Sequence, residues 1–159
     1  MLSQESLEVF YGKTLEFLLG QKFELGENGQ QERALTTGQV GPSLNAFASS
    51  LMIKQLIVRY DGHLPARPLI RFGMTFLPDA QITFNAQKIL AVEVKILREQ
   101  DASGSLSKAI GQTLMYRRLG FECSIGLIFD LRKGKKDDSL GEALLNLSNL
   151  RRTDFILFR

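Results

Sequence analysis

The residues best suited to chemistry lie in an apolar run over residues 89–97. This run predicts a strand, in which alternate side chains face opposite sides of a sheet. Glu93 and Lys95 then share one face, so an acid and a base lie side by side in a segment apolar enough to be a central strand. Burying such charges is costly unless they are paired or coordinate a metal. Two interpretations follow, a same-face ion pair at a sheet edge or one part of a polar site.

A second carboxylate, Asp79, lies fourteen positions before Glu93 and directly after Pro78. Taken alone, Pro-Asp is typical of a turn. If the strands predicted over residues 81–84 and 89–97 pair as a hairpin, however, Asp79 comes beside Glu93. Two carboxylates that converge with a lysine form a hard, oxygen-rich site suited to Mg²⁺.

The helix predicted over residues 106–119 carries a polar stripe. Lys108, Gln112 and Tyr116 are spaced by four and therefore stack on one face of this helix. Such a stripe is usually solvated. Because the remaining helix face is apolar and can pack on the sheet, the stripe can also line a groove that contains the carboxylates.

Together, these three short motifs resemble a known family. Pro78-Asp79, Glu93-Val94-Lys95 and Gln112-Thr113-Leu114-Met115-Tyr116 look like the PD-(D/E)XK nuclease superfamily, in its variant with a Q-x-x-x-Y helix motif. The resemblance covers roughly residues 69–130. The order of the predicted elements also matches the restriction-endonuclease-like core of that family.

The resemblance implies a role for each motif residue. Asp79 and Glu93 would ligate Mg²⁺ or Mn²⁺, and Lys95 would orient the attacking water or help to deprotonate it. Gln112 and Tyr116 would support the catalytic site or contact the nucleic-acid backbone. A metal lowers the pKa of its bound water and neutralises charge on the phosphate. The expected activity is therefore metal-dependent hydrolysis of a phosphodiester, with DNA as the expected substrate.

The family often takes a further acid from an N-terminal helix, and the sequence leaves this residue open. The helix predicted over residues 43–60 contains no Asp or Glu. The candidates are three acids of the helix predicted over residues 3–19 and one in the glycine-rich loop of residues 26–42: Glu5, Glu8, Glu16 and Glu32. Glu16 is taken as the candidate third metal ligand. If no acid reaches the site, the alternative is a catalytically inactive module that binds nucleic acid or a protein partner.

Positive charge is concentrated in the second half of the chain. Residues 1–79 carry seven Lys and Arg against eight Asp and Glu, whereas residues 80–159 carry thirteen against nine. Basic residues can supply phosphate contacts and salt-dependent binding. A solvated basic loop is the alternative interpretation, because Asp137-Asp138 weakens the field of the last cluster. The candidate nucleic-acid contacts are Lys108, Arg117, Arg118, Arg132, Lys133, Lys135 and Lys136.

Length and composition fit one compact domain over residues 1–159. The chain is 44% hydrophobic and 23% charged, which is typical of a globular domain with a core. After two helices, the pattern predicts an alternation of strands and helices that favours an α/β domain with a central mixed sheet of four to five strands flanked by helices. The predicted strands span residues 68–77, 81–84, 89–97, 123–131 and 154–158, and the last helix spans 139–150.

Cysteine usage and hydropathy give expectations about location and partners. One Cys and one His cannot form an intramolecular disulfide or a zinc site of thiolates and imidazoles. Because no stretch approaches the roughly 20 apolar residues that span a bilayer, a cytoplasmic protein without a membrane partner is expected. A chain of 159 residues leaves little room for a separate specificity domain, so a homodimer or a partner subunit could supply it. A small α/β interaction subunit with an incidental Glu-Lys pair remains the other possibility.

Overall fold

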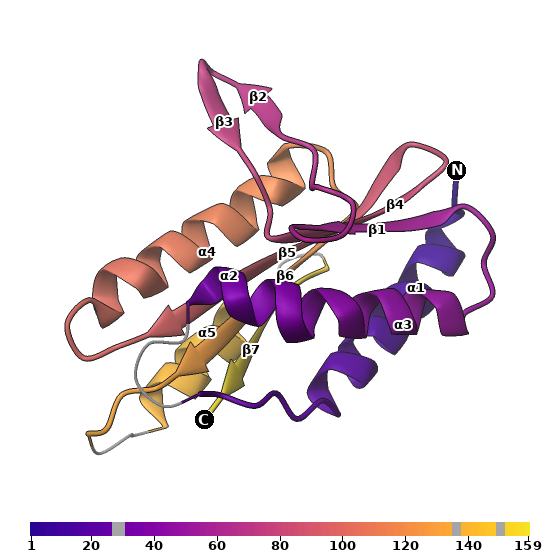
Figure 1. Cartoon of the computed structure of the whole chain (residues 1–159). Helices are drawn as coiled ribbons and strands as arrows, with labels where there is room; N and C mark the ends of the chain where they lie inside the picture. The colour runs from indigo at the N-terminus through magenta and orange to yellow at the C-terminus, as the bar shows by residue number, and fades with distance from the viewer. Residues whose placement is uncertain (27–30, 135–137, 149–151) are drawn as a thin grey trace.

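A mixed sheet runs through the centre of the computed structural model, which describes residues 1–26, 31–134, 138–148 and 152–159 (Figure 1). In the described residues this sheet has five strands in the order β1-β4-β5-β6-β7. Neighbours are antiparallel from β1 to β5 and parallel from β5 to β7. The predicted α/β class with a mixed sheet is therefore confirmed. The strands are β1 (Leu56–Tyr60), β4 (Ala80–Phe84), β5 (Gln87–Leu97), β6 (Cys123–Asp130) and β7 (Thr153–Phe158).

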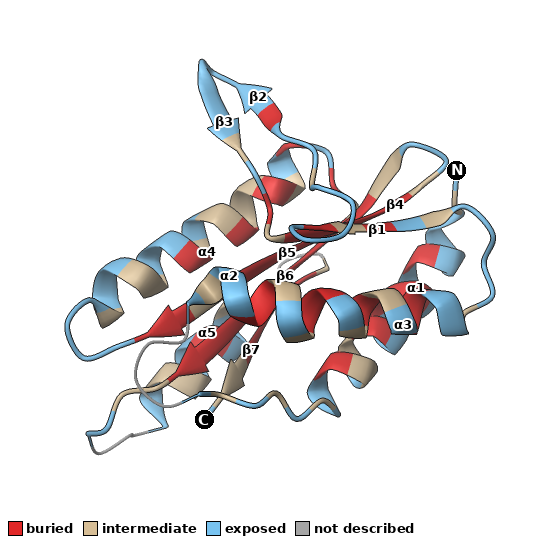
Figure 2. Cartoon of the chain, viewed as in Figure 1, coloured by how far each residue is buried: buried red, intermediate tan, exposed pale blue. Residues whose placement is uncertain are grey.

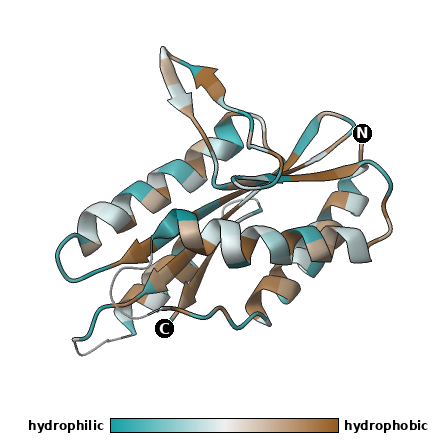
Figure 3. Cartoon of the chain, in the orientation of Figure 1, coloured by the Kyte–Doolittle hydropathy of each residue, from teal (hydrophilic) through white to brown (hydrophobic). Residues whose placement is uncertain are grey.

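Helices cover both faces of the sheet, and the core lies between these layers. Helix α1 (Gln4–Leu19) and helix α3 (Gly41–Ser50) pack on the face of β5 that presents Val92 and Val94. Helices α4 (Ala102–Arg118) and α5 (Ser139–Leu147) pack on the opposite face. The central strands are largely buried (Figure 2) and carry many apolar residues (Figure 3), as expected where helices cover both sides. Among the described helices, none has the length and apolar character needed to cross a membrane.

The predicted boundaries are wrong over residues 26–60. Helix α2 (Glu32–Leu35), a π-helical turn, η1 (Thr36–Val40), and α3 follow one another without a break, and residues 56–60 form the edge strand β1 rather than the end of a helix. Two glycines and Pro42 resemble a loop in the sequence, but Pro42 lies in the first turn of α3, where proline is tolerated. Short apolar runs such as that of β1 fit helical and strand spacing equally well.

A small hairpin replaces the single strand predicted over residues 68–77. Strands β2 (Leu69–Arg71) and β3 (Met74–Phe76) form a separate two-stranded sheet that projects from the body (Figure 1). Its turn residues, Phe72 and Gly73, both have positive φ, at 54° and 69°. This conformation matches the twist of a tight hairpin and divides the run into two short strands.

The joint between η1 and α3 yields a stability prediction. A Cβ on Gly41 would lie 2.2 Å from Cδ2 of the buried Tyr60 ring, so Gly41→Ala is expected to destabilise the protein by about 1–3 kcal/mol through overpacking. Gly12→Ala, in the middle of α1, meets no atom within 4 Å. It should instead stabilise the protein by about 0.5–1 kcal/mol. Urea denaturation of both variants is the measurement, and equal effects would contradict the close approach.

Candidate active site

The site forms where β5 continues beyond its neighbour β4. The ladder between the two strands ends at the pair Ala80–Val92, although β5 continues to Leu97. The free backbone edge is satisfied by side chains: Asp79 Oδ2 accepts a 2.7 Å hydrogen bond from Val94 N, and Glu32 Oε1 accepts one of 3.2 Å from Ile96 N. Because an unpaired backbone N–H is costly, this edge holds two carboxylates in place.

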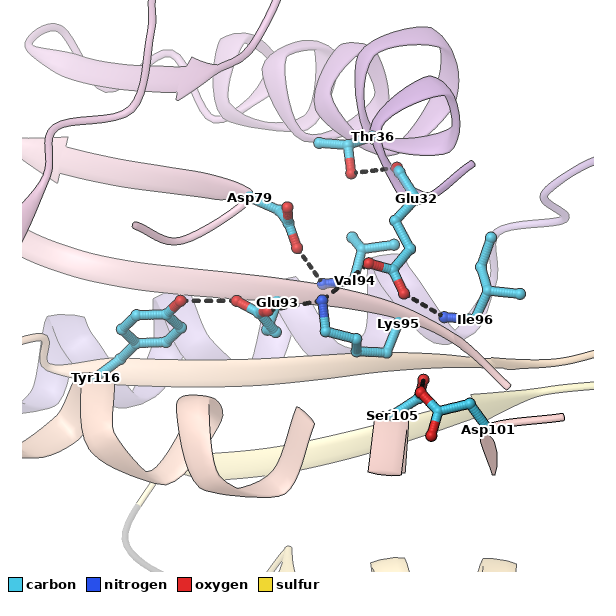
Figure 4. Close-up of polar contacts among 10 residues, drawn as sticks. All are labelled: Glu32, Thr36, Asp79, Glu93, Val94, Lys95, Ile96, Asp101, Ser105 and Tyr116. Atoms are coloured by element: carbon cyan, nitrogen blue, oxygen red, sulfur yellow. Dashed lines mark hydrogen bonds and ion pairs between the residues drawn. The ribbon is translucent and has the colours of Figure 1, made fainter. Parts of the chain in front are cut away.

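Lys95 links Glu32 to Glu93, and Tyr116 contacts the other oxygen of Glu93 (Figure 4). Lys95 Nζ lies 3.2 Å from Glu93 Oε1 and donates a 2.9 Å hydrogen bond to Glu32 Oε2. The other oxygen of Glu93, Oε2, accepts a 2.7 Å hydrogen bond from the Tyr116 hydroxyl of α4. Glu93 is only 2% exposed, so its charge is held almost wholly by these contacts.

Burial disfavours the ionised form of the carboxyl groups of Asp79 and Glu93. Burial, and next the charge of Asp79, raise the pKa of Glu93 to about 7, although Lys95 and Tyr116 act in the opposite direction. Burial also raises the pKa of Asp79, more than the Val94 N–H lowers it. For Lys95, burial lowers the pKa, but Glu93 and Glu32 outweigh it and the net change is upward. Lys95 is therefore an ammonium at neutral pH.

The donor set fits a hard divalent cation. Three carboxylates, from Glu32, Asp79 and Glu93, face one ammonium, so the site has an excess of negative charge when ionised. The described residues contain no group of three or more His, Cys, Asp or Glu side chains arranged to hold a metal. Mg²⁺ keeps several waters and is commonly held by only one or two carboxylates. Asp79 and Glu93 are oxygen donors of the type that such an ion takes, although they form no complete protein cage among the described residues.

Two of the three residues in the predicted polar stripe of α4 are buried at least in part. Tyr116 is fully buried against Ala91 and bonded to Glu93. Burial and then Glu93 raise the pKa of Tyr116, so its hydroxyl stays protonated and donates. One turn earlier, the buried amide oxygen Oε1 of Gln112 has no hydrogen-bond partner among the described residues. Lys108 is exposed, two turns from Tyr116 on the same helix.

The N-terminal acid at the site is Glu32 rather than Glu16. Glu16 is exposed on α1, which packs on the other face of the sheet, whereas Glu32 opens α2 and contacts both Lys95 and Ile96. The choice of Glu16 as third ligand is thus replaced by the candidate assigned to the loop. A sequence signal existed, because Glu32 precedes an apolar helical pattern, but the surrounding glycines concealed it.

Several predicted nucleic-acid contacts are already engaged within the protein. Arg117 donates to the carbonyl of Phe121, and Arg132 forms a two-pronged ion pair with the buried Asp130, with a shortest distance of 2.8 Å. These two guanidinium groups therefore support the fold. Lys108, Arg118 and Lys133 are exposed, while residues 135 and 136 lie outside the described residues.

The contact between Glu32 and the edge of β5 can be tested by stability. Glu32→Ala leaves the Ile96 N–H without its acceptor and is expected to cost about 1–3 kcal/mol, whereas Glu32→Gln keeps an acceptor oxygen and should cost less. Glu16→Ala, at an exposed position, is the matched control and should change stability by less than about 0.5 kcal/mol. Urea unfolding midpoints give the comparison. A loss for Glu16→Ala equal to that for Glu32→Ala would contradict the assignment.

Comparison of the chain with protein-family models and with curated proteins finds no match.

Proposed function

We propose that this protein is a Mg²⁺-dependent nuclease that hydrolyses phosphodiester bonds in DNA. The observation that carries the proposal is the grouping of Asp79, Glu93 and Lys95 at the free edge of β5. It would give a chemical role to the buried charges of Glu93 and Lys95, whose removal from water is costly. The motif order, with Tyr116 of the Q-x-x-x-Y helix bonded to Glu93, adds support from the family resemblance.

In this proposal, two carboxylates would hold a cation, and Lys95 would stabilise negative charge. Asp79 and Glu93 would hold Mg²⁺ or Mn²⁺, which supplies a water of lowered pKa and neutralises charge on the phosphate. Lys95 is already protonated, so it would orient the water and stabilise negative charge rather than accept a proton. Tyr116 keeps the Glu93 carboxylate oriented by its hydrogen bond.

The reaction is hydrolysis of a phosphodiester. The water oxygen forms a bond to phosphorus, and the bond from phosphorus to one sugar oxygen breaks. The proton of the water is released to solvent, and the departing sugar oxygen takes a proton from solvent, so one water is consumed for each bond cut. Lys95, 13% exposed at the margin of the site, is placed to meet the charge that develops on the phosphate oxygens.

The test is a cleavage assay with purified protein. Plasmid and single-stranded DNA are incubated with Mg²⁺, with Mn²⁺ and with EDTA, and products are separated on denaturing gels. We expect cleavage that requires the divalent cation. Absence of cleavage under every condition would overturn the proposed activity.

A second candidate is a catalytically inactive module that binds nucleic acid. It is favoured by one observation, namely that Glu32, Asp79 and Glu93 all have protein partners already. For this candidate, Mg²⁺ and Mn²⁺ would leave thermal stability unchanged, and DNA binding would weaken steeply with salt.

A further inference from the structure

A basic cavity lies on the sheet beside the candidate active site. Its volume is about 380 Å³, and it opens between strands β1 and β4 and the base of the β2–β3 hairpin. None of the described residues that line it is acidic. We refer to it as the arginine groove, after three residues that line it, Arg59, Arg67 and Arg71; Lys88 lies there too. A cavity lined by positive charges alone attracts anions.

The arginines of the groove have no carboxylate partner among the described residues. Other arginines of the chain do, as in the pairs Arg33–Asp61 and Arg152–Glu8. Within the groove, Nε of Arg59 is shielded from solvent and has no hydrogen-bond partner in the part of the chain that the structure describes. An unpaired buried donor is costly, so Nε of Arg59 is a position where an anionic acceptor would be favourable.

The groove and the carboxylates share one face of the sheet. Arg59 is the ladder partner of Gln81, and Gln81 is the partner of Ala91, so the three side chains point to the same side. Ala91 packs on Tyr116, and Glu93 is the next residue of β5 on that face. Two residues of strand correspond to about 7 Å, so an extended anion in the groove would run toward Glu93.

The hairpin stem separates the groove from a second cavity at Asp79. Ala66 and Asp79 line that second cavity, of about 400 Å³, whereas the adjoining residue Arg67 lines the groove. A chain that follows the arginines therefore passes the stem and arrives beside a carboxylate of the site.

The tip of the hairpin is apolar and faces solvent. Phe72 is 82% exposed, and its neighbours Ile70 and Met74 are also exposed; the end of the β2–β3 hairpin is coloured as exposed in Figure 2. An exposed aromatic ring beside unpaired arginines is the combination that binds single-stranded nucleic acid, in which cations track the backbone and rings stack on bases.

We propose that the arginine groove binds the phosphates of a single-stranded segment of nucleic acid and that Phe72 stacks on one of its bases. This inference rests on the proposed function for the identity of the polymer, and it adds the route by which the strand approaches Asp79 and Glu93. The three arginines supply the charge, the groove supplies the direction, and the hairpin tip supplies contact with the bases.

The first test measures binding without cleavage. A fluorescently labelled single-stranded DNA is titrated with protein in EDTA, and anisotropy is followed at several salt concentrations. Arg67→Gln/Arg71→Gln changes only exposed side chains. It should weaken binding about tenfold and reduce the slope of log K against log salt by about 1.4, the value for two lost contacts on a single strand. The matched control, Lys13→Gln/Lys22→Gln, removes the same charge from exposed positions in and just after α1. Unchanged binding in the arginine variant, or an equal loss in the control, overturns the proposal.

The second test isolates the stacking contact. Phe72→Ala should lower affinity for the labelled DNA about tenfold and leave affinity for an abasic strand of the same length unchanged. Equal effects on both strands, or a change in self-association without a change in DNA affinity, would overturn the role of Phe72 and favour a protein-docking tip. If the arginine variant binds DNA as tightly as the wild type and the wild type still cleaves DNA, only this inference is wrong. Specific binding in the groove without any cleavage removes the proposed enzyme activity instead.

Discussion

Asp79→Asn and Lys95→Met are expected to reduce metal-dependent DNA cleavage by at least about 10²–10³-fold each, the usual cost of removing one charged group from a catalytic site. The asparagine oxygen can still accept the Val94 N–H, so this variant changes the charge of the site more than its fold. The methionine keeps most of the volume of Lys95 but removes the ammonium that lies 3.2 Å from Glu93. Initial rates of plasmid and oligonucleotide cleavage are the measurement.

Two exposed positions provide matched controls for this experiment. Glu142→Gln on α5 removes a carboxylate and Lys54→Met removes an ammonium. Both should cleave at the rate of the wild type. Cleavage that persists unchanged in Asp79→Asn and Lys95→Met would show that the activity arises elsewhere or from a contaminant, and the assignment of the site would be wrong.

Glu93→Gln is expected to stabilise the metal-free protein at pH 8. In the folded protein the pKa of Glu93 is about 7, against an ordinary value of 4.5. Ionising this buried group at pH 8 therefore costs folding free energy on the order of 2–3 kcal/mol. Glutamine removes that cost while Tyr116 can still donate to its amide oxygen, and Lys95 keeps its ion pair with Glu32.

The pH dependence of this difference has a definite sign. Below pH 4.5 Glu93 is protonated in both the folded and the unfolded protein, so the carboxylic acid carries no ionisation cost. Between pH 4.5 and about 7 the unfolded chain releases the proton and the folded chain retains it, so wild-type stability falls as pH rises. Glu93→Gln lacks this contribution. Urea unfolding in EDTA from pH 4 to pH 8 should therefore show a stability gap that opens with rising pH.

Metal addition should close most of this stability gap. A cation that binds only the folded protein stabilises it by about 2.7 kcal/mol at a hundredfold excess over Kd. We expect this gain for the wild type with Mg²⁺ or Mn²⁺ and little or none for Glu93→Gln. A stability gap that is flat with pH would contradict the buried ionisation of Glu93. Equal metal responses in the two proteins would contradict its role as a ligand.

The placement of Asp79, Glu93 and Lys95 at one edge could be predicted from local pattern because strand geometry is regular. Alternation along β5 places Glu93 and Lys95 on one face, and the hairpin of β4 and β5 brings Asp79 to the same edge. Spacing by four on α4 likewise places Tyr116 within reach of Glu93. These relations follow from the periods of a strand and a helix, which extend over a few residues only.

Contacts between distant segments could not be predicted in the same way. Glu32 precedes Lys95 by 63 positions, and although the pattern after it favours a helix, no local pattern indicates that its side chain would satisfy a backbone N–H of β5. Arg132 belongs to the basic run in the sequence, but its ion pair with Asp130 makes it a structural residue. The glycine at position 41 resembles a helix break, yet it permits the close approach of Tyr60.

By itself, the sequence determined the α/β class, the central β5 and the charged pair that this strand carries. The spacing of apolar and polar residues along the chain sets which side chains share a face and which are buried. Only the tertiary structure decided which acid joins Lys95, which arginines line the groove and that residues 68–77 fold into a projecting hairpin. The physical reason for the first of these is that β5 extends past Val92, where its pairing with β4 stops. The exposed edge that results requires acceptors, and the segments that supply them are chosen by packing across the whole domain.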